Sequence, residues 1–582
     1  MSESKYFVNQ SSVFSELVDD EDNYNDEVSS DGGSSTSYSD TEPELQDFES
    51  DVFSGLDSDE DDINDRNQII SERRWGYIPR KVDPDKFSNV SRTGTLTRKS
   101  ENINSLKESF HLFIDAEIID IIVTHTNKKA EQSYSKHSQK QWEPVDRIEI
   151  NAFFGLLLII GRFRESNETK DFLWMKNNAL SRQIYTAVMS CDRFKDIFRY
   201  IRFDDATTRV ERKMTDKLAP LRDVTNIFAE NCRESYEATS AGTVDEQLVT
   251  FRGRCPFKVC MPDKPGKYGI KLCTLCDALT YYCCNFDVHL VKISNVADKN
   301  QGQHVVKELT DFWRESGRTI TTDNSFTDIT LAEDLLRNKI FLVGTVRKDR
   351  KDLPKSMVHT YSRQRFSCDC LYTTNLTLVS YVPKPRKCIV LLSSSSYHNE
   401  HSVSGPEDNY KPKIISYYNS TKNSVDRLSR LLREYSCRRA TRRWPLSLFL
   451  NYIDMAAYNA FVVWVTKHPT WECHRSIKKR RVIFLEKLAN ELYARNIDRR
   501  ATDFENRNIV VPRHVVNAIE STGRKLKRKE MTLDYRKRSR CYICVGNDNK
   551  YSTRCDACLQ FICSTHSNIE KHATCVHCTL FE

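Results

Sequence analysis

Residues 318–328, RTITTDNSFTD, predict a β-strand that ends in an acidic turn. All four residues from Thr319 to Thr322 are β-branched, which favours a strand, and the following Asp323-Asn324 pair favours a turn. Two roles are open for Asp323: its carboxylate either accepts hydrogen bonds inside the turn or binds a metal ion. This stretch alone favours the turn, because Asp and Asn are common in turns for local hydrogen-bonding reasons.

The strand lies in a β-rich section that runs from about residue 240 to 400. Short runs typical of strands include TVDEQLVTFRG, KYGIKLCTLCDA, YYCCNFDVHLV and FLVGTVR, and a helix-like run, DITLAEDLLRN, precedes the last of them. Helical patterns flank this section, from about 105 to 235 and from 424 to 466. This order predicts an α/β core that is interrupted by a mostly β insertion before its last helix.

The chain of 582 residues is too long for a single core, and its composition changes along its length. We expect an acidic disordered tail, a linker, a helical domain, a first part of the core, an insertion, a second part of the core with a helical region, a basic linker and a cysteine-rich domain. These segments are predicted at residues 1–70, 71–104, 105–238, 239–350, 351–412, 413–500, 501–540 and 541–582.

The charge of the chain is strongly asymmetric. Residues 1–65 contain 21 Asp or Glu and one Lys, and the net charge of the whole chain is +7, so the remainder carries +27. A basic body predicts a polyanionic partner such as nucleic acid, and the alternative is a solvated surface with a solubilising tail.

Membrane insertion and secretion are not expected. The longest apolar run, at 152–161, is about half of the roughly 20 residues that a bilayer requires, and the first ten residues are polar. We therefore expect the 20 cysteines to be reduced thiols in the cytosol or nucleus.

Two further acids form a set with Asp323. Asp245 lies in the first strand of the β-rich section, and Asp426 opens the helical run SVDRLSRLLREY on a face away from the apolar residues. Three carboxylates from two strands and a late helix would suit two Mg²⁺ ions, which clamp the oxygens of a phosphodiester during cleavage. The alternative for Asp426 is an acid that is stabilised by the positive end of the helix dipole.

Three stretches, at 243–278, 321–354 and 416–448, resemble the piggyBac family of DNA transposases in the same order. The resemblance covers roughly 105–470 and resumes at the C-terminal cysteines. It implies an RNase H-like core split by an insertion, a helical DNA-binding and dimerisation domain, and catalytic aspartates at Asp245, Asp323 and Asp426 that hold two Mg²⁺ ions. It further implies a homodimer that binds transposon terminal repeats, cuts double-stranded DNA through hairpin intermediates and inserts the element at TTAA sites.

The sequence departs from the family near these acids. Asn423-Ser424 stands where a Gly-Gly pair is usual, Ser429 stands where many members carry a further Asp, and Ser325 replaces an aromatic residue. Two interpretations follow: a cut-and-paste transposase, or a domesticated, catalytically weakened protein that binds DNA or chromatin.

Basic side chains gather in two clusters. The first comprises Arg252, Arg254, Lys264, Lys267 and Lys271, and the second comprises Arg438, Arg439, Arg442, Arg443 and the adjacent Trp444. Cations beside aromatic rings suit phosphate contacts and stacking on an unpaired base. A solvated, highly charged face is the alternative, and the family resemblance favours DNA contacts for both clusters.

The C-terminal segment offers four pairs of metal ligands, each pair separated by two residues: Cys541/Cys544, Cys555/Cys558, Cys563/His566 and Cys575/Cys578. Eight such ligands suit two tetrahedral zinc sites, which supply the folding energy that a short segment lacks. Because four residues separate the second pair from the third, we expect a cross-brace, with pairs one and three on one ion and pairs two and four on the other. His572 and His577 are competing ligands.

The resemblance implies that this zinc module reads transposon-end DNA. A RING- or PHD-like protein-interaction domain, including a ubiquitin ligase, is the alternative for the same ligand spacing. The basic runs RKLKRK (524–529) and YRKRSR (535–540) suit nuclear import or a linker that grips DNA, so we expect the protein in the nucleus.

Overall fold

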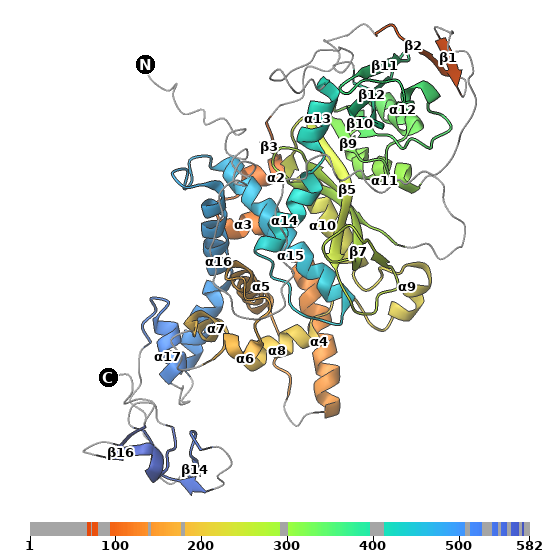
Figure 1. The fold of residues 1–582 in the computed structure, drawn as a ribbon. Helices are drawn as coiled ribbons and strands as arrows, with labels where there is room; N and C mark the ends of the chain where they lie inside the picture. Colours follow the sequence, from red (N-terminus) through yellow and green to blue (C-terminus); the bar gives the residue numbers. More distant parts are fainter. Residues whose placement is uncertain are drawn as a thin grey trace, which may run out of the picture.

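The computed structural model describes most of the chain (Figure 1). The described residues are 67–70, 73–79, 93–137, 141–175, 181–290, 301–395, 412–506, 513–526, 538–544, 549–555, 560–569 and 573–575. Most of the predicted acidic tail and much of the basic linker lie outside these residues, so the disordered tail and the nuclear localisation signal stay predictions.

A helical region occupies much of residues 98–234. Its helices are α2 (Arg98–Glu101), α3 (Leu106–His111), α4 (Ala116–His137), α5 (Arg147–Arg162), α6 (Lys170–Leu173), α7 (Gln183–Val188), α8 (Cys191–Tyr200), α9 (Arg209–Thr215) and α10 (Arg222–Glu234). The longest apolar run of the sequence lies in α5, which begins where the Asp146 carboxylate accepts a hydrogen bond from the Glu149 amide. Such an N-cap satisfies a helix-end donor that otherwise has no partner.

The same helical region is closed by a helix from the far end of the chain, α16 (Ile477–Asn506). A Cβ at Gly155 of α5 would lie 2.9 Å from the carbonyl oxygen of Ala489, so the two helices cross at this glycine. The Arg162 guanidinium also pairs with Glu486 of α16 at 2.5 Å. The helical layer is therefore built from both ends of the sequence.

A mixed sheet forms the centre of the protein. β5 (Ala241–Thr250), β7 (Tyr268–Asp277) and β8 (Cys283–Val288) are antiparallel neighbours, and the short β6 (Lys258–Cys260) pairs with the start of β7. β9 (Thr319–Thr322) and β10 (Phe341–Thr345) run parallel to β5 on its other side. The helices α11 (Gln301–Thr310) and α12 (Ile329–Arg337) precede and follow β9. Because β5 and β9 are parallel with Val244 opposite Thr322, the carboxyl end of β9 lies beside the middle of β5.

The predicted insertion is mostly β, and it continues this sheet. β11 (Cys368–Tyr372), β12 (Thr377–Lys384) and β13 (Lys387–Ser393) follow one another as antiparallel strands, and β13 pairs with β10. Among the described residues, this sheet has 11 strands.

Two of these strands correct the predicted tail and linker. β1 (Asn67–Ile70) and β2 (Arg73–Gly76) lie at the outer edge of the sheet, where β2 pairs with β11. Trp75 is fully buried, and the Arg73 guanidinium makes two 2.9 Å hydrogen bonds to the Glu333 carboxylate of α12. The strand β3 (Thr95–Leu96) likewise pairs with β4 (Tyr236–Glu237). Part of the linker is therefore an integral part of the fold.

The late helices are α13 (Lys413–Thr421), α14 (Ser424–Glu434), α15 (Trp444–Lys467) and α17 (Arg513–Glu520), besides α16. Among the described residues, α15 alone is long and apolar enough to cross a membrane, and its apolar window is completely buried. α15 is thus placed as a core helix. In Figure 1, α14 and α15 lie beside the central strands β5 and β7.

The C-terminal segment contains two small antiparallel pairs: β14 (Ser539–Arg540) with β15 (Lys550–Tyr551), and β16 (Ser567–Ile569) with β17 (Ala573–Cys575). The apolar cluster described in this segment comprises Cys555 and Ile562, with Ile543 packed against them. So small a cluster contributes little to stability, because hydrophobic stabilisation scales with the apolar area that is buried.

Candidate active site

Asp245, in the middle of β5, and Asp323, directly after the end of β9, stand side by side. Val244 of β5 lies opposite Thr322 of β9 in the ladder, so Asp245 and Asp323 are the next residue on each strand. Neighbouring strands are about 4.8 Å apart. The parallel register therefore brings together two acids that are far apart in sequence.

The turn after β9 holds the Asp323 carboxylate in place. Its Oδ1 accepts hydrogen bonds from the amide of Ser325 at 2.9 Å and from the hydroxyl of Ser325 at 2.7 Å. No described residue donates a hydrogen bond to Oδ2 of Asp323. Asp323 therefore stabilises its turn with one oxygen and keeps the other available for a ligand.

Hydroxyl groups attach the helix pair α13–α14 to the sheet. The Thr243 hydroxyl donates to the carbonyl of Thr421 at 2.6 Å and lies 3.1 Å from the Ser424 hydroxyl. The hydroxyls of Thr321 and Thr421 are 2.7 Å apart. All four residues are buried, so these contacts fix the start of α14 against β5 and β9.

These contacts also decide where Asp426 lies. Thr243 precedes Asp245 by two residues and Thr321 precedes Asp323 by two, and side chains two apart on a strand share a face. The helix start is therefore bound to the same face of the sheet that carries both acids. Asp426, in the first turn of α14, is the third carboxylate of this group.

The three carboxylates influence one another. Burial raises the pKa of Asp245 to about 7; Lys264 acts in the opposite direction, and the charges of Asp426 and Asp323 add to the rise. Burial also raises the pKa of Asp323, and this outweighs the hydrogen bonds from Ser325, which lower it. Carboxylates that repel one another in a partly enclosed site favour a bound cation.

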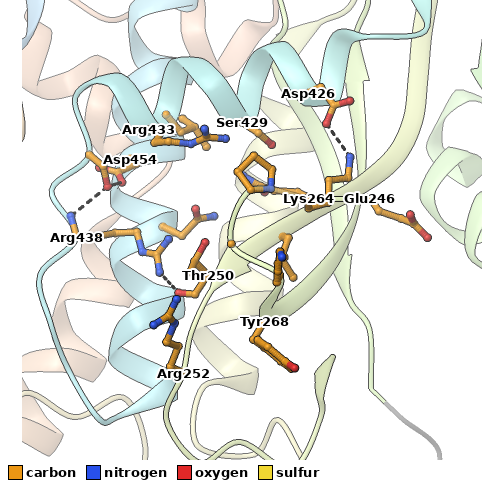
Figure 2. Close-up of a pocket in the computed structure, with 18 of the residues that line it drawn as sticks. Glu246, Thr250, Arg252, Lys264, Tyr268, Asp426, Ser429, Arg433, Arg438 and Asp454 are labelled. Atoms are coloured by element: carbon orange, nitrogen blue, oxygen red, sulfur yellow. Dashed lines mark hydrogen bonds and ion pairs between the residues drawn. The ribbon is translucent and has the colours of Figure 1, made fainter. Parts of the chain in front are cut away.

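One cation of the chain already contacts the site. The Nζ atom of Lys264, on the connection between β6 and β7, lies 2.7 Å from Oδ1 of Asp426 (Figure 2). Burial lowers the pKa of Lys264, but the charges of Asp245 and Asp426 outweigh this and raise it above its usual value.

The donor set fits a hard divalent ion. Carboxylate oxygens are the ligands that Mg²⁺ prefers, and Asp245, Asp323 and Asp426 supply them from three separate elements. Ser429, one turn after Asp426 on α14, lines the same cleft and offers a neutral hydroxyl. Asp245, Asp323 and Asp426 can hold Mg²⁺, with one carboxylate fewer than in the family members that carry an Asp at the position of Ser429.

A cleft of about 1420 Å³ opens beside Asp426, which lines it, whereas Asp245 and Asp323 are not among its lining residues (Figure 2). It is bounded by β5, the β6–β7 connection, α14 and the start of α15, and its cationic lining comprises Arg252, Lys258, Lys264, Lys267, Arg433 and Arg438. The volume exceeds the roughly 300–1,000 Å³ of small-molecule sites. A large, open and cationic cleft suits a polyanion.

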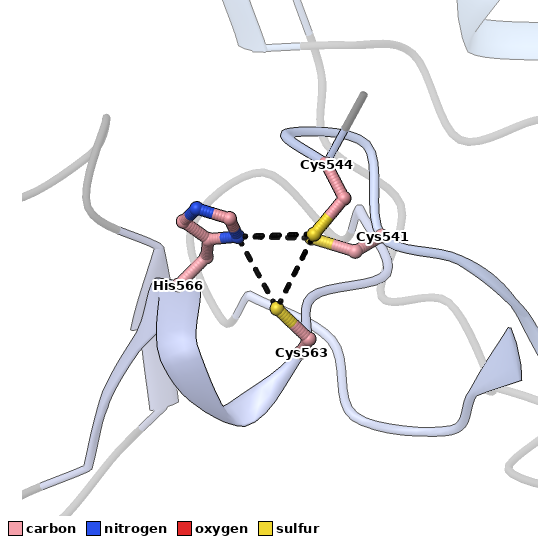
Figure 3. Close-up of side chains that lie close together, drawn as sticks. All are labelled: Cys541, Cys544, Cys563 and His566. Carbon is pink, nitrogen blue, oxygen red and sulfur yellow. Dashed lines mark hydrogen bonds between the residues drawn. The ribbon is translucent and has the colours of Figure 1, made fainter. Parts of the chain in front are cut away.

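A second group of metal ligands lies in the C-terminal segment, where Cys541, Cys544, Cys563 and His566 converge (Figure 3). Nδ1 of His566 is 3.7, 3.4 and 3.2 Å from the sulfurs of Cys541, Cys544 and Cys563, and the last two sulfurs are 3.7 Å apart. Tetrahedral zinc with its usual bond lengths requires separations of roughly 3.5–3.8 Å. The four side chains therefore fit one zinc ion.

The chemistry of these ligands agrees with the geometry. The Thr565 hydroxyl, 3.0 Å from the Cys563 sulfur, and the adjacent thiols lower the pKa of Cys563 to about 6. A thiolate is the form that binds zinc. The structure thus brings together the first and third ligand pairs, which is the grouping that a cross-brace requires.

The other half of the predicted cross-brace is only partly described. Cys555 is buried. Cys558, Cys578 and the competing ligands His572 and His577 lie outside the described residues, as does the side chain of Cys575. The second zinc ion therefore stays a prediction.

Comparison with known proteins places the chain in a family. The family described as transposase IS4 matches residues 106–461, which is more than half of the chain. Among solved structures, a piggyBac transposase synaptic complex with hairpin DNA, determined by cryo-EM, is similar with a TM-score of 0.69 and 31% sequence identity, over 83% of this chain and 99% of that one. The chain belongs to the piggyBac family of transposases.

Two human relatives of this piggyBac-family chain are more distant. PiggyBac transposable element-derived protein 3 is 23% identical over 513 residues, covering 84% of this chain and 78% of that protein. The chimeric ERCC6-PGBD3 protein is also 23% identical over 513 residues, but these cover 44% of its length. The family thus includes both a transposase and proteins named as derived from the element.

The members of the first basic cluster differ in their positions, and their DNA contacts stay a prediction. Arg252, Lys264 and Lys267 line the cleft. Arg254 is exposed but is not among the lining residues, and Lys271 forms an ion pair with Glu246. Three of the five predicted cations therefore face the site in which a polyanion would lie.

The second basic cluster requires a correction. Arg439 and Arg443 are engaged inside the protein: Arg439 donates to the carbonyls of Glu165 and Glu168, and Arg443 donates to carbonyls at the end of α8. Trp444 is 8% exposed and packs edge-on against Phe257, with ring centroids 4.9 Å apart. These three side chains hold helix ends and core together, so the predicted DNA contacts do not agree with their positions.

The remaining members of that cluster differ from each other. Arg438 donates to the Thr250 carbonyl, although it also lines the cleft, and Arg442 is exposed. The segment is a loop between α14 and α15. Arg442 is the cluster member that is free to reach a DNA phosphate.

The departures from the family pattern are accommodated near the site. Asn423 has φ −91° and ψ 9°, a conformation that needs no glycine. Ser424 uses its hydroxyl to bind the Thr421 carbonyl at 2.8 Å, and Ser325 holds Asp323. At Ser429 the site has a hydroxyl in place of the carboxylate that many family members carry there.

Sequence reasoning missed Asp454 in α15. It lines the cleft, is 5% exposed, and accepts hydrogen bonds from the Ser436 hydroxyl at 2.7 Å and the Cys437 amide at 2.8 Å. Burial raises its pKa to about 6. A single acid within the apolar run FLNYIDMAAYNAF was the available signal. Through these hydrogen bonds Asp454 stabilises the loop between α14 and α15 that carries Arg438 to Arg443.

Proposed function

We propose that this chain is a Mg²⁺-dependent, piggyBac-type DNA transposase that uses Asp245, Asp323 and Asp426 to cut and join DNA. The observation that carries this proposal is the convergence of these three acids, from two strands and a helix, beside a cationic cleft. Two bound Mg²⁺ ions would stabilise the attacking and leaving oxygens of a phosphodiester.

The chain's own residues supply the framework for this chemistry. Ser325 orients Asp323, and the buried hydroxyls of Thr243 and Thr421 hold α14 so that Asp426 faces the strands. The cations of the cleft, Arg252 and Lys267 among them, attract the DNA backbone. Preorganised groups of this kind need little rearrangement when the substrate binds.

The proposal extends to the core fold and the assembly. The strand order β8-β7-β5-β9-β10, with β9 and β10 parallel to β5, supports an RNase H-like core. The similarity to a synaptic complex with hairpin DNA supports double-stranded DNA as the partner. We further propose cleavage through hairpin intermediates, insertion at TTAA sites and a homodimer, all carried over from the family resemblance, and a nuclear location, which the basic runs at 524–529 and 535–540 support.

For the C-terminal module we propose two structural zinc ions in a cross-brace that engages transposon ends. The Cys₃His cluster supports the first ion. Arg538, Arg540 and Lys550, in or beside the β14–β15 pair, are exposed cations close to this cluster in sequence, which supports a DNA surface.

DNA cleavage tests the proposal directly. The substrate is a labelled duplex that carries the element's terminal repeat and a flanking TTAA, incubated with Mg²⁺ or with EDTA. We expect nicks and hairpins that require Mg²⁺ and that Asp323→Asn abolishes. Tight binding without cleavage under all conditions would reject the transposase and favour a DNA-binding protein.

The second candidate is a domesticated DNA- or chromatin-binding protein with weakened catalysis. Ser429, which puts a hydroxyl where many family members carry a carboxylate, is the observation in its favour. Ser429→Asp separates the two candidates. If the site is only weakened, this variant cleaves at least tenfold faster than the wild type. If the three-acid site already works, the substitution changes the cleavage rate little.

A further inference from the structure

Lys264 is held over the acids by a short, internally bonded connection between β6 and β7. The Met261 amide donates to the Lys267 carbonyl at 2.7 Å, the Lys264 amide donates to the Met261 carbonyl at 3.2 Å, and the Lys267 amide donates to the Lys264 carbonyl at 3.0 Å. Lys267 adopts a φ of 54°, which closes the turn. The backbone of Lys264 is therefore fixed, and its side chain reaches the carboxylates from an ordered position.

The two lysines of this connection differ in their surroundings. The Lys264 side chain is 20% exposed and its Nζ lies 2.7 Å from Oδ1 of Asp426. Lys267 is exposed, lines the same cleft and has no ion pair with any described residue. Lys264 is paired with an acid, whereas Lys267 faces the open cleft.

The Lys264 contact conflicts with metal binding. A Mg²⁺ ion lies about 2.0–2.1 Å from each oxygen ligand, so an ion on Oδ1 of Asp426 would stand close to an ammonium that is 2.7 Å from the same oxygen. Two cations at this separation repel strongly where water is partly excluded. The flexible four-carbon stem of lysine allows the ammonium to move away.

On the basis of the proposed function, we propose that Lys264 is an internal counter-ion of the catalytic acids that exchanges with the metal ions. In the metal-free protein its ammonium balances Asp426 and Asp245. When metal binds, the ammonium leaves Asp426 and contacts a phosphate of the DNA in the cleft. Lys264 is thus a positioning residue that contributes to DNA binding only in the metal-loaded site.

The first test measures metal affinity by calorimetric titration of the zinc-loaded full chain with Mn²⁺. Lys264→Met should raise the affinity by about fivefold or more, because that factor corresponds to one unit-charge interaction at about 4 Å in water. Lys267→Met is the matched control, since it removes a charge from the same turn without touching an acid, and it should change the affinity by less than about twofold. Equal effects of the two variants would overturn the proposal.

The second test measures DNA affinity with and without Ca²⁺, using a hairpin duplex and no other added divalent ion. Lys264→Met should bind this DNA as the wild type does without Ca²⁺ and about threefold more weakly with it, because the ammonium reaches DNA only after metal displaces it. Lys267→Met should lose affinity equally in both conditions. The same loss in both conditions for Lys264→Met would reject the exchange.

Two further variants keep the outcome interpretable. Lys264→Arg retains the charge, and the guanidinium fork binds carboxylates more firmly, so it should weaken Mn²⁺ binding even if Lys264→Met does not fold. Asp245→Asn and Asp426→Asn test the site itself. If they bind Mn²⁺ like the wild type, the proposed function fails; if they lose Mn²⁺ while the Lys264 variants match the wild type, only the counter-ion role fails.

Discussion

The candidate active site and the C-terminal cysteine cluster both gather side chains that can bind a metal ion, but they do so by opposite means. The acids of the candidate site are Asp245, Asp323 and Asp426, and parallel strands and buried hydroxyls bring them together. The ligands of the cluster lie between residues 541 and 566, and the apolar cluster described beside them contains three residues. One site is positioned by a large core, and the other has almost no core of its own.

This difference decides what each metal does. The cleft keeps its shape without metal, because the hydrogen bonds of Thr243, Thr321 and Ser424 do not involve the acids. There, the proposed metal ions would serve catalysis. In the cysteine cluster, we expect zinc binding and folding to be coupled, since zinc would supply the energy that the small described core lacks.

The largest expected effect is on cleavage. Asp323→Asn should lower the cleavage rate by at least about 10³-fold, as the loss of an essential catalytic group does. The melting temperature should stay the same or rise, because the change removes repulsion between buried acids. Gel-based cleavage kinetics and thermal melting check both parts. Asp263→Asn, an exposed acid of the same cleft, is the matched control and should retain the wild-type rate.

Next is the loss of zinc. Cys563→Ser should release zinc and unfold residues 541–569 while the central sheet is unaffected, because structural zinc contributes about 10–16 kcal/mol in small zinc modules. Zinc content and hydrogen exchange measure this, with Cys473→Ser as a control at an exposed, free cysteine. Loss of protection in β5 or β9 would contradict the independence of the two sites.

A smaller effect is expected where α14 meets the sheet. Ser424→Gly restores one glycine of the family pattern, yet it should destabilise the protein by about 1–2 kcal/mol because it removes hydrogen bonds and places glycine in a helix. Ser424→Ala, which loses only the hydroxyl, should cost less. Chemical denaturation measures both. A gain in stability with glycine would show that the serine is a strained substitute.

The smallest expected effect is a pH dependence of the metal-free protein. Asp245 has a pKa of about 7 in the folded protein, above its ordinary value of 3.8, so between these values the folded state holds a proton that the unfolded state releases. Stability should therefore fall as pH rises from about 4 to 7, and then level off. Melting temperatures at pH 5.5 and 7.5 without divalent ions measure this. Asp245→Asn should make the slope shallower, and an unchanged slope would argue against the raised pKa.

Features with a local signal could be predicted from the sequence. Asp323 follows a strand and precedes a turn, and the Cys-x₂-Cys spacing of the C-terminal segment indicates how its ligands group. The α/β core and its mostly β insertion likewise followed from short strand patterns. Each of these depends on neighbours within a few residues.

Features that depend on distant contacts could not be predicted. Arg439 and Arg443 resemble a DNA-binding cluster in sequence, but in the structure they satisfy carbonyls that lie more than 240 residues away. Arg73 and Trp75 lie in a strand that pairs with β11 at the sheet edge, and Arg73 also binds Glu333. Neither contact has a local signal in the sequence. The contact of Lys264 with Asp426 spans 162 residues and has no local pattern at all.

The most direct test of the three-acid metal site is a crystal structure of the zinc-loaded protein grown with Mn²⁺, with anomalous data recorded at the manganese edge. We predict manganese peaks bound by Asp245, Asp323 and Asp426, with the Lys264 ammonium moved away from Oδ1 of Asp426. An absence of manganese at these carboxylates under saturating Mn²⁺, with Lys264 still paired to Asp426, would contradict the assignment of the active site.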